Sequence, residues 1–296
     1  MPNTKTKVVL SLALLASASI ACRSTDASPN RGADGQPAEI PFRLLNDSLI
    51  VVRGTIGGLK DLDIILDTGA NPTIISSELA MRLNLHGNTE SSVATGGALE
   101  VQSVIVPRID IGKLHMVSSR VVVQDLRFVQ RALGISIQAI AGLDVLSTRS
   151  WMVDYTNRKI LFITAKAQKK SVQFESLSPF LTVKANIAGQ HLRLLVDSGT
   201  PRLLLYRSRV NSKLGRLQPL ATGRDPTVFG AAGTVRAAWF RTLEMSLGDH
   251  RIGPQILLIA DSDSGLNDEF DGLLGLAQSG FHRVWLDFEN ASFAWD

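Results

Sequence analysis

Short apolar runs separated by glycine-containing turns recur from about residue 40 to the end of the chain. Two of these runs, residues 64–66 and 194–196, each follow an apolar stretch and a tight glycine turn, and each ends on an aspartate. This pattern predicts two hairpins whose second strand delivers the aspartate at its end. Long stretches with the 3.6-residue period of a helix are rare, so we expect an all-β fold with a few short helices.

The two halves of the chain repeat one order of features. The aspartate turns at residues 67–70 and 197–200 are 130 residues apart (197 − 67), and the hairpins before them align when one residue is gapped. Each turn is followed by an apolar strand, a short helical segment, a glycine-rich segment, an apolar pair with glycine, and a closing strand. The repetition predicts an internally duplicated fold with lobes at residues 40–165 and 179–296, joined by a linker at residues 166–178.

Composition limits the classes of protein to which the chain can belong. Its 296 residues are 45% hydrophobic and 20% charged, which is enough apolar material for two packed lobes. The net charge of +4 falls to +2 (4 − 2) once Lys5 and Lys7 are left out. This charge is too small to predict a nucleic-acid partner. The single cysteine excludes an internal disulfide.

The first 21 residues have the pattern of an export signal. Two lysines precede an apolar stretch at residues 8–15 that is too short to span a membrane, and small residues then lead to Cys22. A cysteine at this place resembles a bacterial lipoprotein signal, in which Cys22 is lipidated and tethers the protein, although Ser19 stands where leucine is usual. Cleavage by an ordinary signal peptidase after one of the preceding alanines is the alternative. We therefore expect an exported protein, periplasmic or anchored to the outer membrane as a lipoprotein, or else secreted, with a flexible leader at residues 22–39.

The aspartate turns and the glycine segments downstream resemble those of the pepsin and retropepsin superfamily of aspartic proteases. The turns read Asp-Thr-Gly-Ala at 67–70 and Asp-Ser-Gly-Thr at 197–200, and the later segments read Ile-Ala-Gly at 140–142 and Leu-Leu-Gly at 273–275. The similarity extends from about residue 42 to the C-terminus, with a retropepsin-like first half and a pepsin-like second half. The resemblance implies a two-lobed double-ψ β-barrel fold in a single-chain, monomeric endopeptidase that acts on polypeptides.

The resemblance also makes Asp67 and Asp197 the catalytic pair. A glycine two residues after each aspartate permits a sharp turn, and in the family the hydroxyl beside each aspartate reaches the backbone of the other lobe. The supporting residues implied in this way are Thr68, Gly69, Ser198, Gly199 and Thr200. Thr200 can donate a hydrogen bond to Asp197, whereas Ala70 offers none to Asp67, so the pair is not chemically symmetric.

Two carboxyl groups about 3 Å apart cannot both ionise without strong repulsion, so such a pair shares one proton. The ionised member takes a proton from a water held between them, and the protonated member hydrogen-bonds the substrate carbonyl. This chemistry requires neither a metal nor a cofactor, and the five histidines show no metal-ligand spacing. The sequence leaves open which aspartate holds the proton.

Two glycine-rich segments stand where the family has flaps over the substrate. They contain Thr95, Gly96 and Gly97 in the first half and Gly230 and Gly233 in the second. A flap binds extended peptide backbone by adding it as a strand. Neither segment has the tyrosine that pepsin-like enzymes carry in the first flap, so the substrate preference stays open. The alternative function is a catalytically silent module that binds a peptide or glycan on the same fold.

Overall fold

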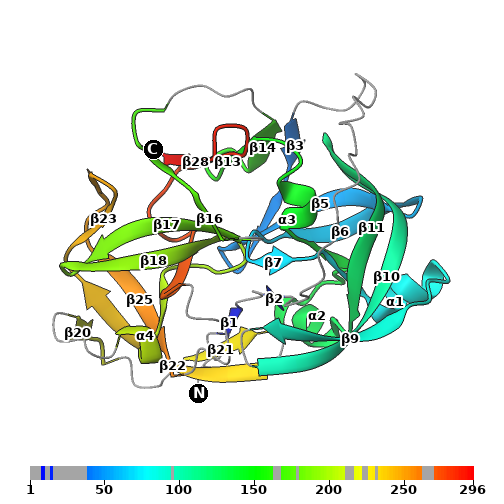
Figure 1. Ribbon diagram of the computed structural model, residues 1–296, viewed down its shortest axis with the longest axis horizontal. Coiled ribbons are helices and arrows are strands. Elements are labelled where there is room, and N and C mark those ends of the chain that lie inside the picture. Colours follow the sequence, from blue (N-terminus) through cyan, green and yellow to red (C-terminus); the bar gives the residue numbers. More distant parts are fainter. Residues whose placement is uncertain are drawn as a thin grey trace, which may run out of the picture.

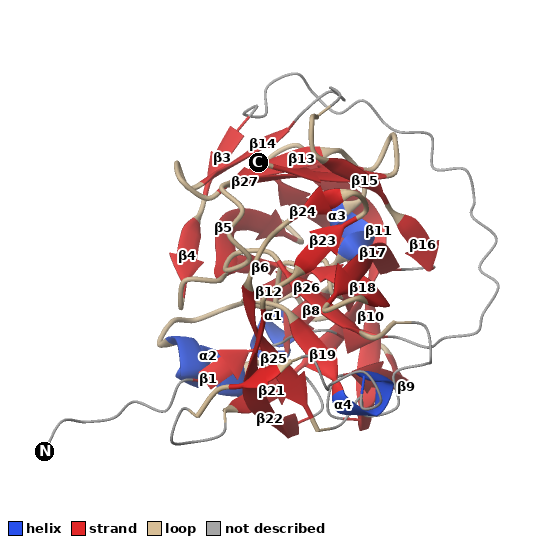
Figure 2. Ribbon diagram, turned by 90° about the vertical axis from the view of Figure 1, so that its left-hand side faces the viewer, coloured by secondary structure: helices blue, strands red, loops and turns tan. Residues whose placement is uncertain are grey.

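The computed structural model describes residues 8–10, 14–15, 39–94, 97–162, 168–177, 180–210, 217–221, 226–230, 233–261 and 270–296. These residues form two lobes, each built on its own sheet, and a third sheet that joins the lobes (Figure 1). Strands predominate and the helices are short (Figure 2). The predicted all-β, two-lobed fold is therefore confirmed.

The first lobe is built on one mixed sheet with the strand order β4-β5-β6-β12-β8-β11-β10-β9-β2-β7. In that order the strands span Arg43–Leu45, Leu49–Ile56, Leu59–Leu66, Ala139–Ala141, Ile74–Ser76, Leu114–Gln124, Gly97–Ile111, Asn88–Ala94, Leu14–Leu15 and Ala70–Asn71. The helices α1 (Ser77–Arg82), α2 (Arg127–Leu133) and α3 (Leu143–Leu146) belong to this lobe. The Ser76 hydroxyl starts α1 because it accepts a hydrogen bond from the Leu79 amide at 3.0 Å.

The second lobe repeats this arrangement on a sheet with the strand order β1-β21-β22-β25-β19-β26-β18-β17-β23-β24. In that order the strands span Val8–Leu10, Thr227–Gly230, Gly233–Thr242, Gln255–Ala260, Leu204–Tyr206, Gly272–Gly275, Gln190–Asp197, Phe180–Ile187, Met245–Leu247 and His250–Arg251. Two more strands pair off this path, β16 (Glu175–Leu177) with β17 and β20 (Gln218–Pro219) with β22. The helix α4 (Arg207–Val210) follows β19.

The third sheet joins the lobes through their closing strands. Its order is β15-β28-β27-β13-β14-β3, with spans Ser171–Gln173, Ser292–Trp295, Arg283–Asp287, Trp151–Asp154, Lys159–Phe162 and Glu39–Pro41. The closing strand of the first lobe, β13, pairs antiparallel with β27 of the second, so that Trp151 lies opposite Leu286. Strands β15 and β16 both fall in the segment predicted to be a linker, so part of that segment is built into the sheets.

The hairpins that lead to the two aspartates are set by local sequence. Strands β5 and β6 turn at Gly57 and Gly58, with φ of 57° and 86°, and strands β17 and β18 turn at Ala188 and Gly189, with φ of 52° and 81°. Two successive positive-φ residues give the turn that matches the twist of an antiparallel pair. The last residues of β6 and of β18 are buried without a break. Continuous burial explains why these strands are apolar runs rather than alternating ones.

Residues 8–10 and 14–15, which the sequence assigns to an export signal, form strands β1 and β2 between the lobes (Figure 1). Strand β1 pairs parallel with β21 of the second lobe, and β2 pairs with β7 and β9 of the first. Cys22, the predicted lipidation site, lies outside the described residues. Among the described helices, none has the length and hydropathy needed to cross a membrane.

Candidate active site between the lobes

Each aspartate lies in the middle of the molecule, at the end of strand β6 or β18. The strand of the apolar-apolar-glycine segment in the same lobe, β12 or β26, pairs with that strand. Strand β12 runs parallel to β6 and β26 runs parallel to β18. The Asp67 amide donates to the Ala141 carbonyl at 3.0 Å, and Asp197 is paired with Gly275. Both aspartates are fully buried.

The structure brings the two carboxyl groups together. The Asp67 and Asp197 side chains hydrogen-bond each other, and each lies against the glycine of the opposite lobe. A β-carbon added to Gly69 would come within 2.8 Å of Asp197 Cγ, and one added to Gly199 would overlap the Asp67 carboxyl. Glycine is therefore required at both positions by the close approach across the lobe boundary, since neither residue has the positive φ that would itself favour glycine.

Four hydrogen bonds join the two aspartate turns reciprocally; Thr68 and Ser198 make them, and we call these two residues the lobe joint. The Thr68 hydroxyl donates to the Val196 carbonyl at 2.8 Å and accepts from the Ser198 amide at 3.0 Å. The Ser198 hydroxyl donates to the Leu66 carbonyl at 2.9 Å and accepts from the Thr68 amide at 3.0 Å. Both residues are buried, so these bonds hold the carboxyl groups in a fixed relation.

The hydrogen bonds to the two carboxyl groups are unequal. Asp197 accepts the Gly199 amide on Oδ1 and the Thr200 hydroxyl on Oδ2, both at 2.7 Å. Asp67 accepts the Gly69 amide on Oδ1 at 2.8 Å, while its buried Oδ2 has no hydrogen bond of ordinary geometry to a donor among the described residues. Ala70 occupies the position that corresponds to Thr200, and it has no hydroxyl to donate.

The pKa values of the pair follow from burial and from these donors. Burial first, and then the charge of Asp197, raise the pKa of Asp67 well above its ordinary value, while the Gly69 and Gly199 amides act in the opposite direction. Burial also raises the pKa of Asp197, but hydrogen bonds from the Thr200 hydroxyl, the Asp67 side chain and the Gly199 amide lower it again. The pair therefore holds a proton at a pH where an exposed aspartate has lost it.

A buried network that sequence reasoning missed fixes the chain just after the first aspartate turn. Asp144 accepts the Thr73 amide at 3.0 Å and the Thr73 hydroxyl at 2.7 Å, and Thr73 Oγ1 accepts the Gly142 amide at 3.0 Å. Burial raises the pKa of the Asp144 carboxyl. The second lobe has no equivalent, because Leu203 and Ala277 stand at the matching positions (73 + 130 and 144 + 133).

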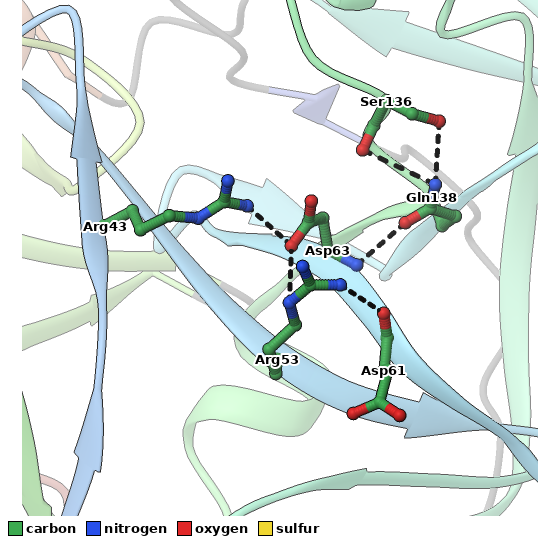
Figure 3. Close-up of polar contacts among 6 residues, drawn as sticks. All are labelled: Arg43, Arg53, Asp61, Asp63, Ser136 and Gln138. Carbon is green, nitrogen blue, oxygen red and sulfur yellow. Dashed lines mark hydrogen bonds and ion pairs between the residues drawn. The ribbon is translucent and has the colours of Figure 1, made fainter.

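A second missed feature recurs in both lobes four residues before each aspartate. In the first lobe the Asp63 amide donates to Gln138 Oε1 at 2.7 Å, and in the second the Arg193 amide donates to Asp271 Oδ2 at 2.8 Å. Figure 3 shows the first of these bonds. There Asp63 Oδ1 also forms ion pairs with the guanidinium groups of Arg43, at 2.6 Å, and of Arg53, at 3.1 Å. These side chains fasten the strands β12 and β26 beside the strands that carry Asp67 and Asp197.

The predicted flap residues lie at the ends of two hairpins. Gly97 begins β10, which pairs with β9, and Gly230 pairs with Gly233 across β21 and β22. Thr95 and Gly96 lie outside the described residues. Strand β9 of the first hairpin pairs with β2, and strand β21 of the second pairs with β1, so an extended segment adds to the edge of each hairpin.

In the described part of the chain, no group of three or more His, Cys, Asp or Glu side chains is arranged to hold a metal ion. A cavity of about 290 Å³ opens beside α1 and α2, lined among others by Ser76, Glu78 and Arg127. Its lining includes neither Asp67 nor Asp197, so the carboxyl pair is the group with evident chemistry.

Comparisons with known proteins reproduce the duplication. A family model described as "Aspartyl protease" matches the chain twice, over residues 52–145 and 183–277. Each match contains one aspartate turn and one apolar-apolar-glycine segment. Among solved structures, that of basic 7S globulin from soybean aligns with a TM-score of 0.47 and 12% identity, covering 88% of this chain and 94% of that one. No curated protein matches the chain.

Proposed function

The chain belongs to the aspartyl protease family, and we propose that it is an endopeptidase that hydrolyses peptide bonds through Asp67, Asp197 and an activated water. One observation carries this proposal. Two fully buried carboxyl groups, delivered by equivalent turns of two lobes, hydrogen-bond each other. A buried like-charged pair is unfavourable for stability alone, and it is the arrangement that acid–base catalysis requires.

The chemistry follows from the sharing of one proton. The carboxylate member removes a proton from a bound water, whose oxygen attacks the carbonyl carbon of the substrate. The protonated member donates to the carbonyl oxygen, which stabilises the negative charge that develops there. The proton taken from water then passes to the leaving amine, and the pair returns to its starting state.

A polypeptide substrate is supported by the way the chain's own N-terminal strands lie. Strand β2 adds to β9 in antiparallel register and to β7 in parallel register, with Leu14 opposite Ala70. Strand β1 adds to β21. Backbone edges in both lobes therefore accept extended peptide backbone, which is the binding mode of strand addition.

We also propose that the protein acts after export, either tethered by a lipid on Cys22 or released by ordinary signal cleavage. The support is the order of lysines, apolar run and small residues before Cys22. The mass of the mature N-terminus distinguishes the two forms, and a Cys22→Ser variant releases the protein from the membrane fraction only if the lipid is its tether.

The function is tested with Asp67→Asn and Asp197→Asn. We expect each to lower cleavage of a peptide library by at least about 100-fold, because acid–base catalysis alone contributes about 10² to 10⁴. Cleavage is followed by mass spectrometry from pH 3 to pH 7, with thermal unfolding as the control for folding. An Asp67→Asn protein that cut peptides at the parental rate would exclude the mechanism. A peptide held but left uncut by the parent would replace the endopeptidase by the binding module.

A further inference from the structure

We propose that Asp67 holds the shared proton and acts as the acid, and that Asp197 is the carboxylate that activates the water. The assignment rests on the proposed function and gives each aspartate one role. It is drawn from the donors that face the four carboxyl oxygens, which differ between the two lobes.

Both oxygens of Asp197 face a donor. The Gly199 amide meets Oδ1 and the Thr200 hydroxyl meets Oδ2, each at 2.7 Å. Hydrogen bonds of this kind stabilise the ionised form of a carboxyl group, and two or three of them lower its pKa substantially. The donors around Asp197 therefore favour its ionised form.

Asp67 lacks the hydroxyl donor that Asp197 has. The Gly69 amide meets Oδ1 at 2.8 Å, while Oδ2 is buried, has no hydrogen bond of ordinary geometry and lies against Gly199 of the opposite lobe, whose amide also lowers the pKa of Asp67. A buried oxygen that faces another carboxylate without an ordinary hydrogen bond is stabilised by a proton of its own. Such a proton completes the hydrogen bond between Asp67 and Asp197, with Asp67 as the donor.

The inequality is fixed by sequence, because Ala70 holds the position that Thr200 holds in the other lobe. Ala70 is fully buried and packs in the hydrophobic cluster of the first lobe, among residues such as Ile74 and Ile140. A methyl group cannot replace the missing hydroxyl. Beyond burial, the groups that shift the two pKa values are the two carboxyls themselves and the donors of Gly69, Gly199 and Thr200.

The assignment gives a balanced sequence of proton transfers. Asp197 takes a proton from water as the O–C bond forms, and Asp67 gives its proton to the carbonyl oxygen, which yields a tetrahedral diol. Asp197 then protonates the leaving nitrogen as the C–N bond breaks, and Asp67 recovers a proton from a diol hydroxyl. The products are a carboxylic acid and an amine, and the pair is again protonated on Asp67.

The test exchanges the donors and follows both ends of the pH profile of kcat/KM in the full chain. In Thr200→Val, Asp197 loses a donor, so its pKa should rise and the acidic limb should move to higher pH by about one to two units, the value of one hydrogen bond to a charged group. In Ala70→Ser, Asp67 gains a donor, so its pKa should fall and the basic limb should move to lower pH. Thr200→Ser keeps the hydroxyl and is the matched control, with both limbs expected in place.

The reverse assignment predicts the crossed result, with Thr200→Val moving the basic limb and Ala70→Ser the acidic limb, and that outcome overturns the proposal. Carboxyl ¹³C NMR of aspartate-labelled full chain supplies a readout without turnover, with the two signals identified from the Asp67→Asn and Asp197→Asn proteins. Asp67 should titrate at the higher pH. If it does and no peptide is cut, the endopeptidase proposal fails and the assignment of the shared proton to Asp67 stands. If peptides are cut and Asp197 titrates higher, the assignment alone fails. Ala70→Ser keeps the test decisive if Thr200→Val does not fold.

Discussion

Removing one hydroxyl of the lobe joint should destabilise the whole molecule. Thr68→Ala deletes the hydroxyl that joins the Val196 carbonyl at 2.8 Å and the Ser198 amide at 3.0 Å. Both partners are buried, so each loses this hydrogen bond in a place that excludes water. A buried polar group in that state costs about 1–3 kcal/mol, which makes about 2–6 kcal/mol for the two. Native domains are stable by only about 5–15 kcal/mol, so the loss is a large share of the total.

The matched control is Thr68→Ser, which keeps the hydroxyl and loses one methyl group worth about 1 kcal/mol. Urea unfolding followed by tryptophan fluorescence compares the two, because the fully buried Trp151 lies in the sheet that joins the lobes. We expect Thr68→Ala to be less stable than Thr68→Ser by about 4 kcal/mol, the middle of the range above. Adding Ser198→Ala should cost less than the sum of the single changes, because the reciprocal bonds are in one network. A difference of less than about 1 kcal/mol between the alanine and serine variants would refute the role of this hydroxyl.

Three further results are expected. Burial and Asp197 raise the pKa of Asp67 above 3.8, so the folded chain keeps a proton that the unfolded chain loses. Its contribution to stability is complete below about pH 4 and is lost, by up to about 1.4 kcal/mol per pH unit, as the pH rises toward the folded pKa. Asp67→Asn should remove this loss, so the free energy of unfolding in urea should rise relative to that of the parent between pH 3 and pH 7. A difference in unfolding free energy that stays constant with pH would contradict the argument. The hydroxyl of Tyr155 is buried without a partner among the described residues, so Tyr155→Phe should leave the Tm unchanged or raise it, and a loss above about 1 kcal/mol would reveal a missed bond. A chain without residues 1–21 should cleave peptides faster than the full chain, because β1 and β2 no longer cover the edges of β21, β7 and β9; equal rates would show that these strands do not compete with substrate.

The position of the two aspartates could be read from the sequence because the cause is local. Each follows a glycine hairpin and an apolar run, and a run buried on both faces has no other place than the middle of a sheet. The donors within three residues, such as Thr200 for Asp197, are local too. The turn at Asp154 is local in the same way, because Asp154 accepts the Asn157 amide three residues later at 2.8 Å.

The rest depends on segments that meet only in the folded chain. Thr73 and Asp144 are 71 residues apart, and Asp271 accepts from an amide 78 residues before it. No local pattern fixes which side chain lies opposite which amide, because that depends on the register between distant strands. For the same reason the sheet that joins the lobes was not foreseen, since it pairs Trp151 with Leu286.

Duplication and divergence have separate effects on the site. The bonds that join the lobes are equivalent in both halves, since each carboxyl lies against the other lobe's glycine and each joint hydroxyl bonds the other lobe's backbone. Moving the lobes apart would therefore end the sharing of the proton. The positions that differ between the lobes take no part in those bonds. Thr200 in the second lobe corresponds to Ala70 in the first, and the Thr73–Asp144 network is present in the first lobe only. A change at these positions can alter the acidity of one carboxyl while the joint stays intact. Two copies of one turn can thus take different roles in a reaction that needs both an acid and a base.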